Sequence, residues 1–122
     1  MDGSKRRDLL LKLADLIERD MEYLEELESL DNGKPLGRNG AYGSKFDMMG
    51  SAAGFRYHAG WADKLQGKVI PVDGNNLCYT RREPVGVCGC IIPWKYVQKE
   101  ASYSAPIVFL SANAAFNCFS FC

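Results

Sequence analysis

The chain has 122 residues, which suits one small domain, and its 47% hydrophobic and 25% charged residues are ordinary for a globular protein. Its 15 basic and 15 acidic residues cancel, so composition predicts neither nucleic acid nor an anionic membrane as a partner. The charge is uneven, since residues 103–122 carry none, and this shift predicts a boundary ahead of them.

The first element predicted is a helix capped by Ser4 and running to about Arg19. Its apolar residues recur at three- and four-residue spacing, as one face of a helix requires. The stripe consists of Leu9, Leu10, Leu13, Leu16 and Ile17.

A second helix is predicted from Asp20, which can cap it, to a stop at Gly33. Gly33 suits the left-handed position after a helix, and Pro35 prevents continuation. The expected core face consists of Met21, Leu24, Leu27 and Leu30.

A third, longer helix is predicted from Ser44 to about Gln66, with Asp47 completing a capping box. Three glycines inside this span disfavour the helix by about 1 kcal/mol each. Its expected apolar side consists of Met48, Met49, Ala52, Phe55, Ala59 and Ala62.

Residues 69–82 have the pattern of two strands around a turn. Val69 to Pro71 is a short strand, residues 73–76 (DGNN) form the turn, and Leu77 to Arg82 alternates. The second strand is either an edge or subunit-contact strand or part of a solvated hairpin.

The stretch from Glu83 to Trp94 indicates a turn followed by a buried strand. Val87 to Ile92 is apolar without alternation, which is typical of a strand covered on both faces, and Pro93 ends it. Ligands bind beyond the carboxyl end of such strands, which puts Ile92, Pro93 and Trp94 beside a site. No convincing crossover helix or second strand follows.

The cysteines are odd in number and no secretory leader is evident, so we expect reduced thiols in an intracellular protein. They are Cys78, Cys88, Cys90, Cys118 and Cys122. One residue separates Cys88 from Cys90, which argues against a redox or zinc CxxC pair and favours buried packing. His58 is the only histidine, so we expect no metal site.

Four blocks of sequence, in order and without a large gap, resemble one enzyme family. They are LADLIERD at 13–20, DNGKP at 31–35, RYHAGWADK at 56–64 and TRREPVGVCG at 80–89. Together they resemble the NAD-dependent aldehyde dehydrogenases, most of all the tetrameric cytosolic and mitochondrial class that oxidises retinal and small aldehydes. The likeness runs from about Lys5 to Trp94.

This resemblance implies an α/β fold, an incomplete amino-terminal part of a doubly wound coenzyme-binding domain with three helices followed by a few strands. Residues 5–94 would form that part, and Leu77 to Arg82 would belong to the arm that builds family homo-tetramers. Ile91, Ile92, Pro93 and Trp94 would form part of the NAD site. The implied location is cytoplasmic, with a mitochondrial one left open.

The resemblance stops at Lys95, which stands where the family has the Asn that donates to the oxyanion. The family's glycine-rich turn, glutamate base and nucleophilic cysteine have no counterpart in residues 95–122, and Cys118 and Cys122 lack the nucleophile's context. We therefore expect no catalytic residue, no dehydrogenase activity and at best weak NAD binding from these residues alone.

Residues 95–122 are predicted to be an unrelated tail. Codons for Lys95, Tyr96 and Val97 can spell AAG TAY GTN, which contains a splice-donor consensus, so translated intron is one origin and a diverged functional tail is the other. A non-catalytic alternative for the whole chain is an interaction protein that binds full-length aldehyde dehydrogenase subunits. A thiol-redox protein using Cys88 and Cys90 is a third, which their spacing disfavours.

Overall fold

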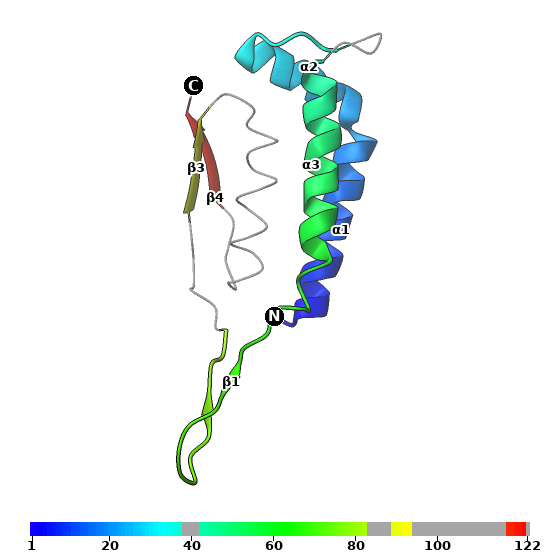
Figure 1. Ribbon diagram of the computed structural model, residues 1–122. Helices are drawn as coiled ribbons and strands as arrows, with labels where there is room; N and C mark the ends of the chain where they lie inside the picture. The colour runs from blue at the N-terminus through cyan, green and yellow to red at the C-terminus, as the bar shows by residue number, and fades with distance from the viewer. Residues whose placement is uncertain (38–41, 83–88, 94–116, 122) are drawn as a thin grey trace.

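The computed structural model describes residues 1–37, 42–82, 89–93 and 117–121. The helices α1 (Gly3–Arg19), α2 (Met21–Asn32) and α3 (Ser44–Ala59) come first, followed by the strands β1 (Val69–Ile70), β2 (Cys78–Tyr79), β3 (Gly89–Pro93) and β4 (Asn117–Phe121). Figure 1 shows α1 and α3 side by side, the β1–β2 hairpin reaching away beyond them, and β3 with β4 as a separate pair. Three helices followed by a few strands is the predicted arrangement.

The core of the described residues lies between α1 and α3. It contains Leu10, Ala14, Ile17, Ala52, Phe55, Ala59 and Ala62. Ala14 and Ala59 are fully buried, and such small side chains let two helix backbones approach closely. At the rim, the Arg56 guanidinium donates to Asp15 at 2.7 Å and to Glu18. These contacts fix α3 along α1.

Helix α1 has the predicted end at Arg19 but a different start and a rotated face. It begins at Gly3 after Asp2, whose side chain makes no capping hydrogen bond, so Ser4 is not the cap. Leu9 and Leu13 are exposed, although Leu10 and Ile17 are buried. Ala14 lies at the centre of the contact because the close helix pair needs a small residue there.

The predicted core face of α2 is wrong. Glu25 and Glu28 are the buried residues of this helix, whereas Leu30 is 83% exposed and Leu27 is also exposed. Leu24 alone of the predicted stripe packs against the α1–α3 core. Periodicity identifies an apolar face but not the element that covers it, and α2 buries Glu25 and Glu28 instead.

Of the two predicted caps of α2, the one at its start is wrong and the one at its end is confirmed. Asp20 makes no capping bond, because its carboxylate accepts two hydrogen bonds from the neighbouring Arg19 guanidinium at 2.9 and 2.6 Å. Gly33 closes the helix in the left-handed region at φ +75°, and its amide donates to Ser29. The predicted glycine stop is therefore confirmed, since a side chain would strain that conformation.

Helix α3 starts at the predicted residue, but Ser44 and Asp47 do not form a capping box. The Ser44 hydroxyl is buried without a hydrogen-bond partner, and the Asp47 carboxylate binds other groups. The helix ends at Ala59 rather than near Gln66, because Gly60 is followed by tighter turns. Those turns still keep Ala62 in the core.

The predicted hairpin is present, with shorter strands. β1 and β2 pair antiparallel, Val69 opposite Tyr79 and Ile70 opposite Cys78, around a turn in which Gly74 has φ +77°. The Thr80 amide donates to the Lys68 carbonyl at 2.8 Å and extends the pairing by one step. Beyond Thr80 no regular strand continues to Arg82.

A second strand does follow β3, contrary to the sequence-based expectation. β4 pairs with β3 in parallel, with Gly89 opposite Asn117 and Pro93 opposite Phe121. The expectation failed because residues 117–121 (NCFSF) mix polar and aromatic residues and carry no continuous apolar run. The predicted end of β3 at Pro93 is confirmed.

Candidate functional site

The carboxyl ends of β3 and β4 form one edge of a parallel pair. Ile92 is paired with Ser120 and Pro93 with Phe121, so both strands end at the same place. Open α/β sheets bind ligands beyond this end, because the loops that leave it diverge and open a crevice. The strand direction at this edge is therefore the one found at nucleotide-binding sites.

Two adjacent residues of β3 have opposite environments. Ile92 is 4% exposed and Ile91 is 78% exposed, so the strand is covered on one face rather than on both. Pro93 lacks an amide proton and ends the ladder. The structure thus places three of the four predicted cofactor residues at this edge, whereas Trp94 and Lys95 lie outside the described residues.

NAD, which the resemblance implies, would meet only part of its site here. The backbone of β3 ends at Ile92 and Pro93, at the carboxyl end of the parallel pair. A dinucleotide also needs donors for its pyrophosphate, usually from a glycine-rich turn at a helix start, and the described residues contain none at this edge. The described residues therefore hold no complete NAD site.

A buried ion pair joins the segment after α2 to the start of α3. Lys34 contacts the Asp47 carboxylate, and the two side chains are 10% and 1% exposed. The Tyr42 hydroxyl donates to the other Asp47 oxygen at 3.2 Å, and the Lys34 ammonium lies 4.0 Å from the centre of the Tyr42 ring. Burial lowers the pKa of Lys34, but its hydrogen bonds to Asp47 and Tyr42 outweigh this and raise that pKa above its ordinary value.

The ion pair explains why the DNGKP block is compact. The Lys34 amide donates to the Asn32 side-chain oxygen at 2.8 Å, and the Asn32 amide group donates to Glu28 at 2.9 Å. Ser29 donates to the Lys34 carbonyl. Because each charge has its partner, this cluster positions a loop rather than exchanging protons. Sequence reasoning missed it by assigning Asp47 to a helix cap.

The hairpin exposes most of its apolar side chains. Leu77 is 76% exposed and Tyr79 63% exposed, and Val69, Ile70 and Val72 are exposed as well. A two-stranded hairpin is at best marginal in water without a further partner. Its surface is therefore a candidate for contact with another protein segment, as the predicted arm requires.

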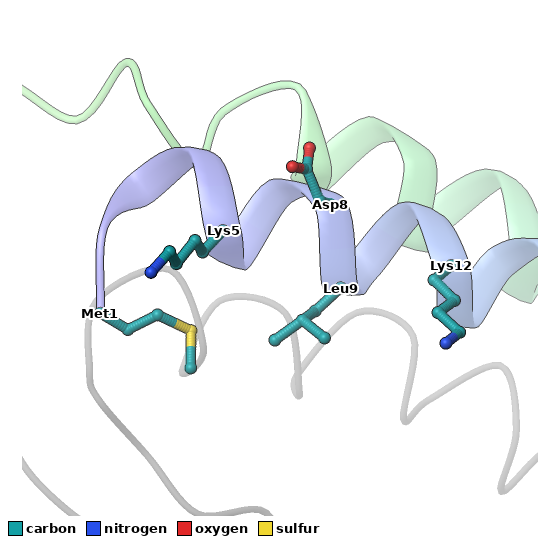
Figure 2. A pocket seen from close by; sticks show the side chains of 5 residues that line it. All are labelled: Met1, Lys5, Asp8, Leu9 and Lys12. Atoms are coloured by element: carbon teal, nitrogen blue, oxygen red, sulfur yellow. The ribbon is translucent and has the colours of Figure 1, made fainter.

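One pocket, of about 340 Å³, lies on α1 away from the candidate edge (Figure 2). Its lining residues are Met1, Lys5, Asp8, Leu9 and Lys12. They follow one another along one end of the chain, and Asp8 points away from Leu9 in the view. Surface lysines around one leucine do not define a built site.

His58 and the described cysteines lie in different elements of the fold. His58 Nδ1 lies 2.8 Å from the Gly54 carbonyl, one turn earlier in α3. Cys78 is half-buried in β2, Cys118 is in β4, and Cys88 and Cys122 lie outside the described ranges. Within those ranges no group of three metal-ligating side chains occurs, and no helix is long and apolar enough to cross a membrane.

Comparison with known proteins gives a consistent result. The model of the aldehyde dehydrogenase family matches residues 1–115. The mitochondrial aldehyde dehydrogenase of Rattus norvegicus is 57% identical over 96 residues, which cover 79% of this chain and 18% of that protein. The chain thus spans about a fifth of the curated relatives it matches.

Solved structures agree with the sequence comparison. An NAD-dependent aldehyde dehydrogenase from Sinorhizobium meliloti superposes with a TM-score of 0.87 and 33% identity, over 98% of this chain and 23% of that one. An NAD+ complex of an aldehyde dehydrogenase from Bacillus cereus gives 0.85 and 38%, over 97% and 23%. The chain therefore has the fold of a segment of these enzymes.

Proposed function

Because the chain belongs to the aldehyde dehydrogenase family, we propose that residues 5–94 are the amino-terminal part of an NAD-dependent enzyme that oxidises aldehydes to carboxylic acids. The observation that carries this proposal is the 57% identity over 96 residues to a mitochondrial aldehyde dehydrogenase. It is supported by a parallel strand that ends at Pro93, where the family resemblance puts the coenzyme.

In the proposed enzyme, a cysteine would add to the aldehyde and, after oxidation, water would release the acid. The part assigned to this chain would be to hold one side of the coenzyme at the carboxyl end of β3, where Ile92 and Pro93 lie. Bound NAD would supply the hydride acceptor. The nucleophile and the general base would come from elsewhere in a longer family polypeptide.

A chimera tests this assignment. Residues 5–94 would replace the matched segment of the rat mitochondrial enzyme, followed by that enzyme's own sequence. We expect a folded protein that forms NADH in the presence of aldehyde. A soluble, tetrameric chimera without activity would contradict the assignment, because assembly would then be intact while the segment failed in the site.

A second chimera, differing in one residue, tests Lys95. Extending the transplanted segment to include Lys95 replaces the family's Asn donor, so kcat should fall about 10²–10³-fold, the usual loss for one oxyanion donor. Lys95→Asn in that chimera should restore the rate. Equal rates with lysine and asparagine would show that residue 95 does not occupy the oxyanion position.

Alone, the 122-residue polypeptide is proposed to be inactive and to bind NAD weakly, since only one side of the site is at hand. Aldehyde-dependent NADH formation by pure protein, or micromolar NAD affinity by calorimetry, would refute this. Sequencing the transcript across the codons of residues 94–97 tests the intron origin of residues 95–122. A message that splices there and continues through Asn would show that these residues come from an intron of an ordinary aldehyde dehydrogenase gene, whereas an abundant message that reads through residues 95–122 and then stops would show that the short protein is made.

The exposed hairpin favours a second candidate function, binding to full-length aldehyde dehydrogenase subunits. Leu77 and Tyr79 would pack against the partner subunit, as the family's arm does in its homo-tetramers. The test is co-purification of tagged chain with an intact aldehyde dehydrogenase from the same cells. The fractionation of those cells also tests the proposed cytoplasmic location against the mitochondrial one that the relatives' names carry.

A further inference from the structure

Two cysteines far apart in sequence occupy paired positions in the β3–β4 sheet. The strands run parallel, and the register pairs Cys90 with Cys118. Of the other cysteines, Cys78 belongs to the separate β1–β2 sheet, and Cys88 and Cys122 fall outside the described residues. The juxtaposition therefore selects one pair among the five cysteines of the chain.

The spacing of this pair suits a covalent link. Neighbouring strands lie about 4.7–4.9 Å apart, and residues in register on them belong to the same face of the sheet. Disulfides join Cα atoms that are about 4.4–6.8 Å apart. The Cα spacing that this register gives Cys90 and Cys118 thus lies within the Cα range of disulfides.

We propose that Cys90 and Cys118 form a reversible intramolecular disulfide when the chain meets an oxidising low-molecular-weight disulfide. One cysteine thiolate attacks that small disulfide, forms a mixed disulfide and expels a thiolate. The second cysteine thiolate then attacks the protein sulfur of the mixed disulfide and releases the other small thiol. The protein loses two electrons and two protons, and the small disulfide is reduced to two thiols.

The link fastens β4 to β3, the strand whose carboxyl end forms the candidate coenzyme edge. It closes a loop that includes residues 94–116 and so restricts the chain between the two strands. The reduced thiols predicted from composition are the starting state of this reaction. The proposal depends on the β3–β4 register alone and stands apart from the proposed enzymatic function.

Two variants of the whole chain, each with two cysteines, test the pair. The first carries Cys78→Ser, Cys88→Ser and Cys122→Ser and keeps Cys90 and Cys118. The matched control carries Cys78→Ser, Cys90→Ser and Cys118→Ser and keeps Cys88 and Cys122. Both are incubated with oxidised glutathione, digested with trypsin without reductant, and measured by mass spectrometry.

The first variant should yield peptide 83–95 joined to peptide 100–122, from monomeric protein, at least about tenfold faster than the control, which should accumulate glutathione adducts. Urea should remove that advantage. In the unaltered chain, fragmentation should locate the link at Cys90 and Cys118. Equal rates in the two variants, an advantage that persists in urea, or links only between molecules would each overturn the proposal.

Discussion

The α1–α3 layer and the β1–β2 hairpin differ in how far their apolar side chains are buried. In the helical layer Ala14, Ala52 and Ala59 are buried against one another. In the hairpin Leu77 and Tyr79 stand in solvent. The two helices complete a core from their own residues, whereas the described residues leave the apolar side chains of the hairpin uncovered. Substitutions in the two regions should therefore have unequal consequences.

The largest effect is expected from a charge in the helical core. Ala52→Asp buries a carboxylate between α1 and α3, which costs several kcal/mol and should abolish the helical signal in circular dichroism. Ala53→Asp, at the adjacent exposed position of α3, is the matched control and should cost less than about 1 kcal/mol. Similar helical signals from the two variants would mean that α3 does not pack as described.

The buried ion pair should give the next largest effect. Asp47→Ala leaves the Lys34 ammonium buried without its main partner, which costs about 3–5 kcal/mol in urea unfolding. The double variant Lys34→Met, Asp47→Leu removes both charges and should recover most of that loss. If the double variant is no more stable than Asp47→Ala, the loss of stability comes from removing the ion pair and not from leaving the Lys34 ammonium unpaired.

The Arg56 contacts at the rim of the core should matter less and depend on pH. The Arg56 hydrogen bond lowers the pKa of Glu18, so this stabilisation is present above the ordinary value of 4.5 and disappears as pH falls through the lowered pKa. Arg56→Gln should therefore lower the melting temperature slightly near neutral pH and not in acid. Arg19→Gln, whose partner Asp20 is the next residue, should change it even less at either pH. A loss from Arg56→Gln that persists in acid would contradict this pairing.

The smallest effect on stability is expected in the hairpin. Leu77→Asp places a charge where the side chain is already in solvent, so the unfolding transition of the helices should move by less than about 0.5 kcal/mol. The same substitution should abolish co-purification with full-length subunits, if the hairpin is the contact surface. Lys68→Asp, beside β1 and exposed, is a control for added negative charge. An unfolded Leu77→Asp chain would show that the hairpin supports the helical layer.

The sequence predicted those features that depend on local chemistry. Gly33 ends α2 because this position needs a left-handed backbone conformation, which glycine adopts without strain. Pro93 ends β3 because it lacks a backbone N–H donor. It also predicted α3's buried face, with the exception of Met49, which is exposed. The four sequence blocks carried the family, which comparison confirmed.

The features that it missed depend on contacts between distant residues. Asp47 was assigned to a cap three residues away, yet it binds Lys34, thirteen residues earlier. The leucines of α2 are apolar and periodic, yet Glu28 is the buried residue, because Asn32 and the Lys34 loop meet that face. β4 has no continuous apolar run that would predict a strand, and only its pairing with β3 identifies it as one.

Hydrogen exchange of the whole chain, followed by mass spectrometry, tests the contrast between the two regions most directly. Amides in α1 and α3 should exchange slowest, because they surround the buried Ala14 and Ala52, and those in the β1–β2 hairpin should exchange fastest. That result would show a helical layer with its own core beside a less stable hairpin. A hairpin protected as strongly as α3, or an α3 that exchanges as fast as the hairpin, would contradict the account.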